Sequence, residues 1–253
     1  MNRDFEQFAD CRQYLGECLG QTGLVLDEEA CNTLVRYVGL LARWNRAYNL
    51  TSVRDPLEMV VRHILDCLVI LPYIRGMRLL DLGTGAGLPG IVLAIARPDI
   101  KCVLLDGNGK KTRFCRQVTA ELGLSNVEVL QLRAEEYMPA TLFTTITARA
   151  FGPFSVLWNH AGRLLAPDGR LLAMKGMKKE IMKEIGNTGK SRGSIPEAAL
   201  PAGNLSRPAD SPGGYGWFAY PAPISGKCRI VALSVPDLDA ERHLVIVEHD
   251  LTI

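Results

Sequence analysis

The chain has 253 residues, 47% of them hydrophobic, and 29 Lys and Arg against 27 Asp and Glu leave a formal net charge of +2. This length and hydrophobic content exclude global disorder, and the near-neutral charge neither requires nor excludes nucleic acid. The seven cysteines are scattered without a C-x-x-C pair, which argues against a disulfide scaffold and a zinc site. With no signal-peptide hydrophobic region and no apolar run of membrane-spanning length, we expect a soluble, cytoplasmic protein without a resident metal.

Residues 1–75 are predicted to form a helical extension. Residues 27–29, Asp-Glu-Glu, have the pattern of an N-cap followed by an acidic first turn, and apolar residues recur at helical spacing after them. Asp55 followed by Pro56 predicts the start of a second helix, which we expect to end near Pro72. Between the two helices lies a segment rich in aromatic, basic and amide side chains, residues 43–51.

Residues 76–253 are predicted to form an α/β domain. Five strand-like runs alternate with helix-like runs of about a dozen residues, and these strands are residues 78–81, 101–106, 127–131, 144–147 and 170–174. Such alternation predicts a mostly parallel sheet with helices on both faces, whose ligands bind at the carboxyl ends of the strands. Residues 228–233 and 243–248 are expected to add an antiparallel hairpin, giving seven strands. A stretch rich in Gly, Pro, Ser and Asn, about 186–222, is predicted to be an irregular insertion.

The most informative motif is the glycine-rich tract of residues 79–90, which joins a strand to a helix start. Gly85-x-Gly87-x-x-Gly90 matches the dinucleotide fingerprint of an NAD(P)-dependent oxidoreductase. Asp81-x-Gly83-x-Gly85-x-Gly87 matches the first motif of class I S-adenosylmethionine-dependent methyltransferases. Asp81 favours the second interpretation, because an acid before the first glycine suits the charged amino-acid end of that cofactor. Asp106, at the end of the next strand, can accept both ribose hydroxyls in either class.

Other chemistries have little support in the sequence. There is no G-x-S-x-G, no H-E-x-x-H and no P-loop lysine pattern. After the fourth strand the chain has Thr-Ala-Arg-Ala-Phe at residues 147–151, where enzymes that methylate exocyclic amines tend to have Asn/Asp-Pro-Pro-aromatic. The Pro-Cys pair common in cytosine-C5 enzymes is absent. We therefore expect a reaction that needs neither amine recognition nor a covalent intermediate.

Several longer motifs share one pattern: Trp44-Asn45-x-x-Tyr48-Asn49-Leu50-Thr51-x-x-Arg54-Asp55-Pro56, Arg62-His63-x-x-Asp66, the tract 81–90, Leu105-Asp106-x-x-Gly109-Lys110-Lys111, Arg149-Ala150-Phe151, Lys175-Gly176 and Asp239-x-Glu241-Arg242-His243. Together they resemble the bacterial small-subunit (16S) ribosomal RNA guanine-N7 methyltransferase family, also called glucose-inhibited division protein B. The similarity runs from about residue 25 to 180 and resumes near 228. Two departures are Gly107, where the family usually has serine, and the length of the insertion.

The resemblance implies a Rossmann-like class I methyltransferase fold, S-adenosylmethionine as cofactor and the small-subunit RNA or 30S particle as partner of a monomer. The residues implied or predicted to bind the cofactor are Asp81, Gly83, Gly85, Leu88, Asp106, Ala134, Glu135 and Arg149. Guanine N7 carries a lone pair and no proton, so direct in-line methyl transfer needs no catalytic residue and depends on positioning.

Basic side chains at the carboxyl ends of the strands are the candidates for RNA binding, namely Lys110, Arg133 and Lys175. A single surface charge is more often only solvated, and Trp44, Tyr48 and His63 are more typical of packing than of substrate contact. A noncatalytic RNA-binding module is a further alternative, for which Gly107 is the only hint.

Overall fold

The computed structural model describes residues 8–188, 218–219 and 226–249. Its N-terminal part is helical up to Tyr73, and the elements are α2 (Ala9–Thr22), α3 (Glu28–Tyr48), α4 (Pro56–Met59), the π-helix η1 (Val60–Leu65), α5 (Asp66–Leu68) and the 3₁₀ helix η2 (Leu71–Tyr73).

Both predicted helix starts are confirmed by their caps. The Asp27 carboxylate accepts a hydrogen bond from Ala30 N at 2.7 Å, and the Asp55 carboxylate accepts one from Glu58 N at 2.9 Å. These bonds satisfy backbone donors that have no partner inside the helix. The second helix is less regular than predicted, because one π-helical stretch separates α4 from α5, which ends at Leu68. Asp66 follows this π-helical stretch directly, and such stretches are frequent at functional sites.

All seven predicted strands are confirmed. The strands are β1 (Arg78–Leu82), β2 (Lys101–Leu105), β3 (Val127–Leu130), β4 (Phe143–Arg149), β5 (Leu165–Lys175), β7 (Gly226–Leu233) and β8 (Arg242–His249). The sheet order is β3-β2-β1-β4-β5-β8-β7-β6, with β1 to β5 parallel and β8 antiparallel to both β5 and β7. The additional two-residue strand β6 (Phe218–Ala219) falls within the expected insertion, whose residues 189–217 and 220–222 lie outside the described residues.

The connecting helices are α6 (Gly90–Ala96), α7 (Gly109–Leu122), η3 (Ala134–Glu136), α8 (Phe154–Ala161) and α9 (Lys178–Thr188). The connections were predicted to contain helices of about a dozen residues. α7 has 14 residues, whereas α6 and α8 have only seven and eight, and between β3 and β4 only the 3₁₀ helix η3 forms. Pro139 follows shortly after and disfavours helical backbone at the residue before it. α9 also continues two residues past the predicted start of the insertion.

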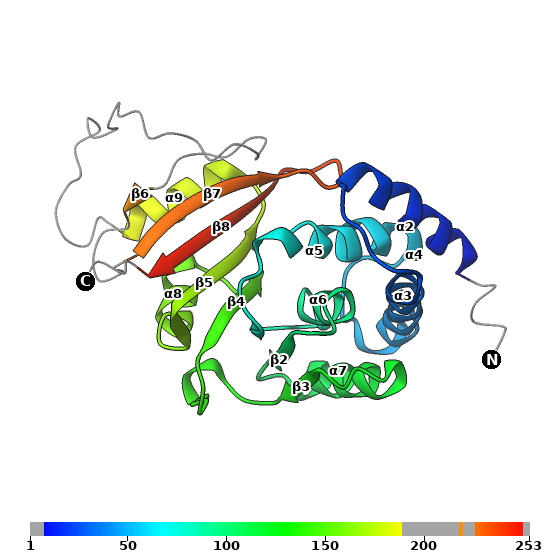
Figure 1. Ribbon diagram of the computed structural model, residues 1–253, viewed down its shortest axis with the longest axis horizontal. Helices are drawn as coiled ribbons and strands as arrows, with labels where there is room; N and C mark the ends of the chain where they lie inside the picture. Colours follow the sequence, from blue (N-terminus) through cyan, green and yellow to red (C-terminus); the bar gives the residue numbers. More distant parts are fainter. Residues whose placement is uncertain (1–7, 189–217, 220–225, 250–253) are drawn as a thin grey trace.

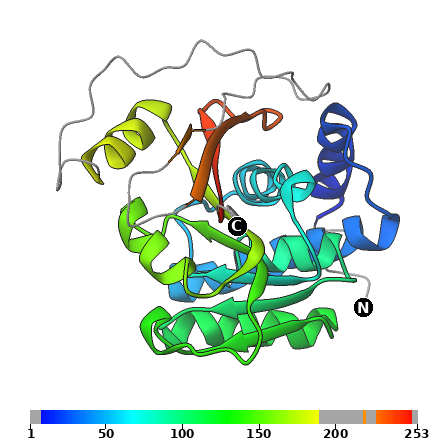
Figure 2. The same ribbon diagram turned by 60° about the vertical axis from the view of Figure 1, so that its left-hand side comes forward.

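Two hydrophobic clusters cover the two faces of the sheet. Leu79, Leu104 and Leu172 pack on the side of α2–α7, whereas Leu80, Val103 and Leu171 face α8 and α9. The two views agree that the N-terminal helices gather beside α6 and α7, away from α8 and α9 (Figures 1 and 2). The predicted boundary near residue 75 thus separates chain segments that share a single core.

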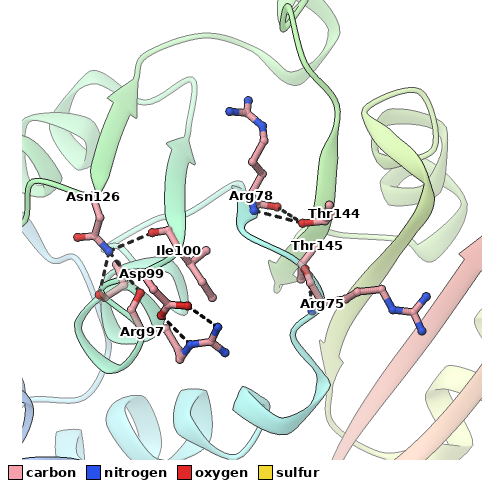
Figure 3. Close-up of polar contacts among 9 residues, drawn as sticks. Arg75, Arg78, Arg97, Asp99, Ile100, Asn126, Thr144 and Thr145 are labelled. Atoms are coloured by element: carbon pink, nitrogen blue, oxygen red, sulfur yellow. Dashed lines mark hydrogen bonds and ion pairs between the residues drawn. The ribbon is translucent and has the colours of Figure 1, made fainter.

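Side-chain hydrogen bonds connect neighbouring segments at the amino end of the sheet (Figure 3). The Thr144 hydroxyl donates to Arg78 O at 3.0 Å and accepts from Arg78 N at 3.2 Å. The Thr145 hydroxyl makes the same pair of bonds with the backbone of Arg75, at 2.7 and 2.8 Å. Asn126 Nδ2 donates to three carbonyls at the end of α6, including Ile100 O at 3.1 Å. Because these contacts occupy the amino end, we expect a ligand to bind at the carboxyl ends of the strands.

All seven cysteines are buried free thiols, as expected for small hydrophobic residues. Across the described ranges, no helix is both long and apolar enough to span a membrane.

Candidate cofactor pocket and its surroundings

The glycine-rich turn leaves the carboxyl end of β1 with a left-handed backbone. Gly83, Gly85 and Gly87 have φ values of +71°, +61° and +87°, which side-chain-bearing residues rarely adopt. A Cβ on Gly83 would lie 2.6 Å from the Phe151 ring. The turn therefore needs glycine at Gly83 both for its backbone and for the space beside Phe151.

Asp81 stabilises this turn through hydrogen bonds to its side chains and backbone. Its Oδ2 accepts hydrogen bonds from the Thr84 hydroxyl at 2.5 Å and from Gly90 N at 2.9 Å, and its Oδ1 accepts one from the Thr147 hydroxyl at 3.1 Å. Burial raises the pKa of Asp81 to about 6, and the three hydrogen bonds act in the opposite direction.

The expectation that Asp81 contacts the amino-acid end of the cofactor does not fit this geometry. The residue is 0% exposed, so its carboxylate does not reach the pocket surface and supports the turn from inside the protein.

Asp106 connects the turn after β1 to the turn after β2. Its Oδ2 accepts from Gly85 N at 2.9 Å, and its Oδ1 accepts from Asn108 N at 2.8 Å. Lys111 Nζ lies 3.9 Å from Oδ2. Each carboxylate oxygen has a second lone pair, and the side chain is part of the pocket surface, so Asp106 can accept further hydrogen bonds from a ligand.

A pocket of about 460 Å³ opens at the carboxyl ends of β1, β2 and β3, within the size range of small-ligand sites. Five predicted site residues line it: Gly83, Asp106, Arg133, Ala134 and Glu135. The other six lining residues were not predicted as site residues from the sequence: Leu82, Leu105, Gly107, Asn108, Leu132 and Phe151. Phe151 could have been found, because it completes the motif that begins at Arg149.

The other predicted site residues do not line this pocket. Leu88 is buried in the core beneath the turn, and the N–H of Gly85 is directed to Asp106. Lys110 is exposed in the first turn of α7. Lys175 Nζ is held by Glu184 at 2.9 Å and by Gly152 O at 3.0 Å. A phosphate contact through Lys175 would therefore require the break of an existing ion pair.

Arg149 lies next to the pocket in an ion-pair cluster with the helical extension. Its Nη1 donates to Asp66 Oδ2 at 3.4 Å and to Arg62 O at 3.2 Å. Arg242, at the start of β8, donates from Nε to Asp66 Oδ1 at 2.9 Å. Asp66 is 2% exposed, so one buried carboxylate of the extension contacts an arginine at the end of β4 and another at the start of β8. Asp66 and Arg242 both belong to motifs shared with the family, but no role was predicted for either residue from the sequence.

The two aromatic residues at the end of α3 differ in their surroundings. Trp44 packs against Phe114 of α7, with ring centroids 5.5 Å apart, which confirms the expectation of packing for Trp44. Tyr48 stacks on Trp44 at 5.0 Å and is 41% exposed, so part of its ring is available to solvent.

His63 is buried as expected. Its Nδ1 is 2.8 Å from Arg62 O, an acceptor, so this nitrogen carries the proton and Nε2 accepts from the Thr51 hydroxyl at 2.8 Å. Burial, with a further contribution from Arg149, lowers the pKa of His63 to about 4.

The lowered pKa of His63 predicts a pH dependence of stability. The unfolded chain binds a proton near pH 6.5 and the folded chain only near pH 4, so this stabilisation is present above pH 6.5 and is lost as the pH falls towards 4. We expect the wild type to lose about 3 kcal/mol relative to His63→Gln over this range. Urea unfolding at pH 7.5 and pH 4.5 measures the difference. Asp81 has the opposite dependence, but it is common to both proteins and cancels. A difference that stays constant with pH would contradict the prediction.

The strand order, the glycine turn after β1 and the acid after β2 define the class I S-adenosylmethionine-dependent methyltransferases. The family model GidB, described as rRNA small subunit methyltransferase G, matches residues 30–192, and the chain belongs to this family. This relationship gives no support to the NAD(P)-dependent oxidoreductase alternative.

Curated relatives carry the same name as the family. A ribosomal RNA small subunit methyltransferase G from Alkalilimnicola ehrlichii is 44% identical over 88% of this chain and 86% of its own length. The protein of that name from Yersinia enterocolitica is 41% identical over 92% of this chain and 97% of its own. Among solved structures, a SAM-dependent methyltransferase from Aquifex aeolicus has 16% identity and a TM-score of 0.49, covering 79% of this chain and 96% of that chain.

Proposed function

We propose that the protein transfers a methyl group from S-adenosylmethionine to N7 of a guanine in small-subunit (16S) ribosomal RNA. The observation that carries the proposal is the pocket between Gly83 and Asp106, in a chain whose family is described as an rRNA small subunit methyltransferase.

The residues of the pocket fit this cofactor. Gly83 allows Phe151 to pack against the turn at the edge of the pocket, and Asp106 retains lone pairs that can accept hydrogen bonds from ribose hydroxyls. Ala134 and Glu135 form the wall after β3, where an adenine ring would lie. Arg149, held by Asp66, is assigned to the amino-acid end, and Gly85 and Leu88 shape the turn. S-adenosylmethionine supplies an electrophilic sulfonium methyl group when bound.

The chain then acts by orienting the two reactants. Guanine N7 needs no deprotonation, so no side chain is assigned as general base. Correct alignment can contribute roughly 7–11 kcal/mol to the lowering of the barrier.

The A-form major groove hides N7, so the target guanine has to be unpaired or extruded. Lys110 and Arg133 are the proposed phosphate ligands at the pocket mouth. We also propose that the protein acts as a monomer on ribosomal RNA in the cytoplasm.

The test is transfer of tritiated methyl from S-adenosylmethionine to 30S subunits and to naked 16S RNA. We expect label that is recovered as 7-methylguanosine. Label on an exocyclic amine or in protein would contradict the assigned acceptor. RNA binding without any transfer would favour the noncatalytic alternative.

A further inference from the structure

A second, smaller pocket lies in the helical extension at the last turns of α3. It measures about 320 Å³ and is lined by Phe8, Ala42, Asn45, Arg46, Arg54 and Pro56. Arg46 and Arg54 are both exposed, and neither forms an ion pair with another residue in the described part of the chain. Among the described residues, the side chain of Arg54 donates one long hydrogen bond, 3.4 Å, to the Asn49 side chain. The neighbouring Asp55 carboxylate is engaged by the backbone at the start of α4.

The charge of this pocket contrasts with that of another groove in the same extension. A pocket of about 600 Å³ between α2, α4 and the loop before β8 is lined by five carboxylates, those of Asp10, Glu17, Glu58, Asp237 and Asp239. Its one basic residue, Arg62, is paired with Glu58 at 2.7 Å. The acidic groove repels phosphates, and the pocket of Arg46 and Arg54 attracts them. A polyanion would therefore bind to the extension on the side of the basic pocket.

A short chain of contacts connects the basic pocket to the region of the cofactor pocket. Asn45 is 2% exposed and fixes the loop after α3, with hydrogen bonds to Val53 O at 3.0 Å and from Thr51 N at 2.9 Å. The Thr51 hydroxyl contacts His63, and the neighbouring Arg62 O accepts from Arg149.

We propose that the pocket of Arg46 and Arg54 binds backbone phosphate of the RNA substrate, beside the nucleotide that enters the methyl-transfer site. A guanidinium offers a planar pair of donors that match phosphate oxygens, and two such groups around one cavity fit one or two phosphates. The proposal rests on the proposed function for the identity of the RNA.

The experiment compares the wild type with the double variant Arg46→Ala/Arg54→Ala. Binding to naked 16S RNA and to 30S subunits is measured by filter retention at several salt concentrations, together with methyl transfer. We expect roughly tenfold weaker RNA binding and a salt dependence whose slope falls by about 1.4, or about 0.7 for each lost phosphate contact. Cofactor affinity should be unchanged.

Arg43→Ala is the matched control, because Arg43 lies one turn before Arg46 on the same helix and is already paired with Glu121 at 3.2 Å. We expect little change from it. Unaltered RNA affinity and salt slope in the double variant, or an equal loss in Arg43→Ala, would overturn the proposal. A loss seen with 30S subunits but not with naked RNA would also overturn it, by pointing to a ribosomal protein. If the wild type binds RNA as expected but transfers no methyl group, the proposed function fails while the phosphate site is still supported.

Discussion

Asp106→Ala is expected to weaken S-adenosylmethionine binding about 100-fold. The carboxylate is proposed to accept two hydrogen bonds from the ribose, and bonds to a charged acceptor contribute about 1.5 kcal/mol each. The substitution also releases Gly85 N and Asn108 N, which Asp106 now holds at 2.9 and 2.8 Å, so the glycine turn loses an anchor. Isothermal titration with S-adenosylmethionine measures the change directly.

Two further variants test whether the loss of cofactor affinity is specific to the Asp106 carboxylate. Asp106→Asn keeps the shape and one acceptor oxygen, so we expect an intermediate loss. Asp99→Ala removes an exposed acid that pairs with Arg97 at the opposite edge of the sheet, and it should leave cofactor affinity unchanged. Wild-type affinity in a folded Asp106→Ala protein would show that the ribose is bound elsewhere.

Asp66→Asn is expected to have the second largest effect, because it leaves Arg149 and Arg242 without their shared counter-charge. The Asp66 side chain is only 3% exposed, and removal of one member of a buried pair typically costs about 3 kcal/mol or more. We expect a loss of this size in the free energy of unfolding, measured with urea. We also expect weaker cofactor binding, because Arg149 loses the group that orients it.

The control for Asp66 is another ion pair of the extension. Glu58→Gln breaks the pair with Arg62, in which both side chains are almost half exposed, so we expect a change below about 0.5 kcal/mol. Equal effects of Asp66→Asn and Glu58→Gln on stability would show that the buried cluster contributes no more than a surface pair. Asp66→Glu keeps the charge and should recover part of the cofactor affinity if Asp66 positions Arg149.

The partners of long charged side chains were not predictable from the sequence. Lys175 was placed correctly at the end of a strand, yet its ammonium group is held by Glu184, which comes from α9. Arg149 was also placed correctly, and its contact with Asp66 depends on how the extension packs against β4. Both partners lie at least nine residues away along the chain, so no local pattern shows them.

The sequence by itself determined the elements whose causes are local. Helix starts follow from caps such as Asp27 and Asp55, strands follow from short apolar runs, and the glycine turn follows from residues that tolerate positive φ. Only the tertiary structure decided that Asp81 supports the turn from inside, because its burial depends on Thr147 from β4. The joining of Arg149 to Asp66 and the exposure of Arg46 and Arg54 were decided in the same way. These features depend on contacts between segments distant in sequence, whose approach is set by the packing of the whole core.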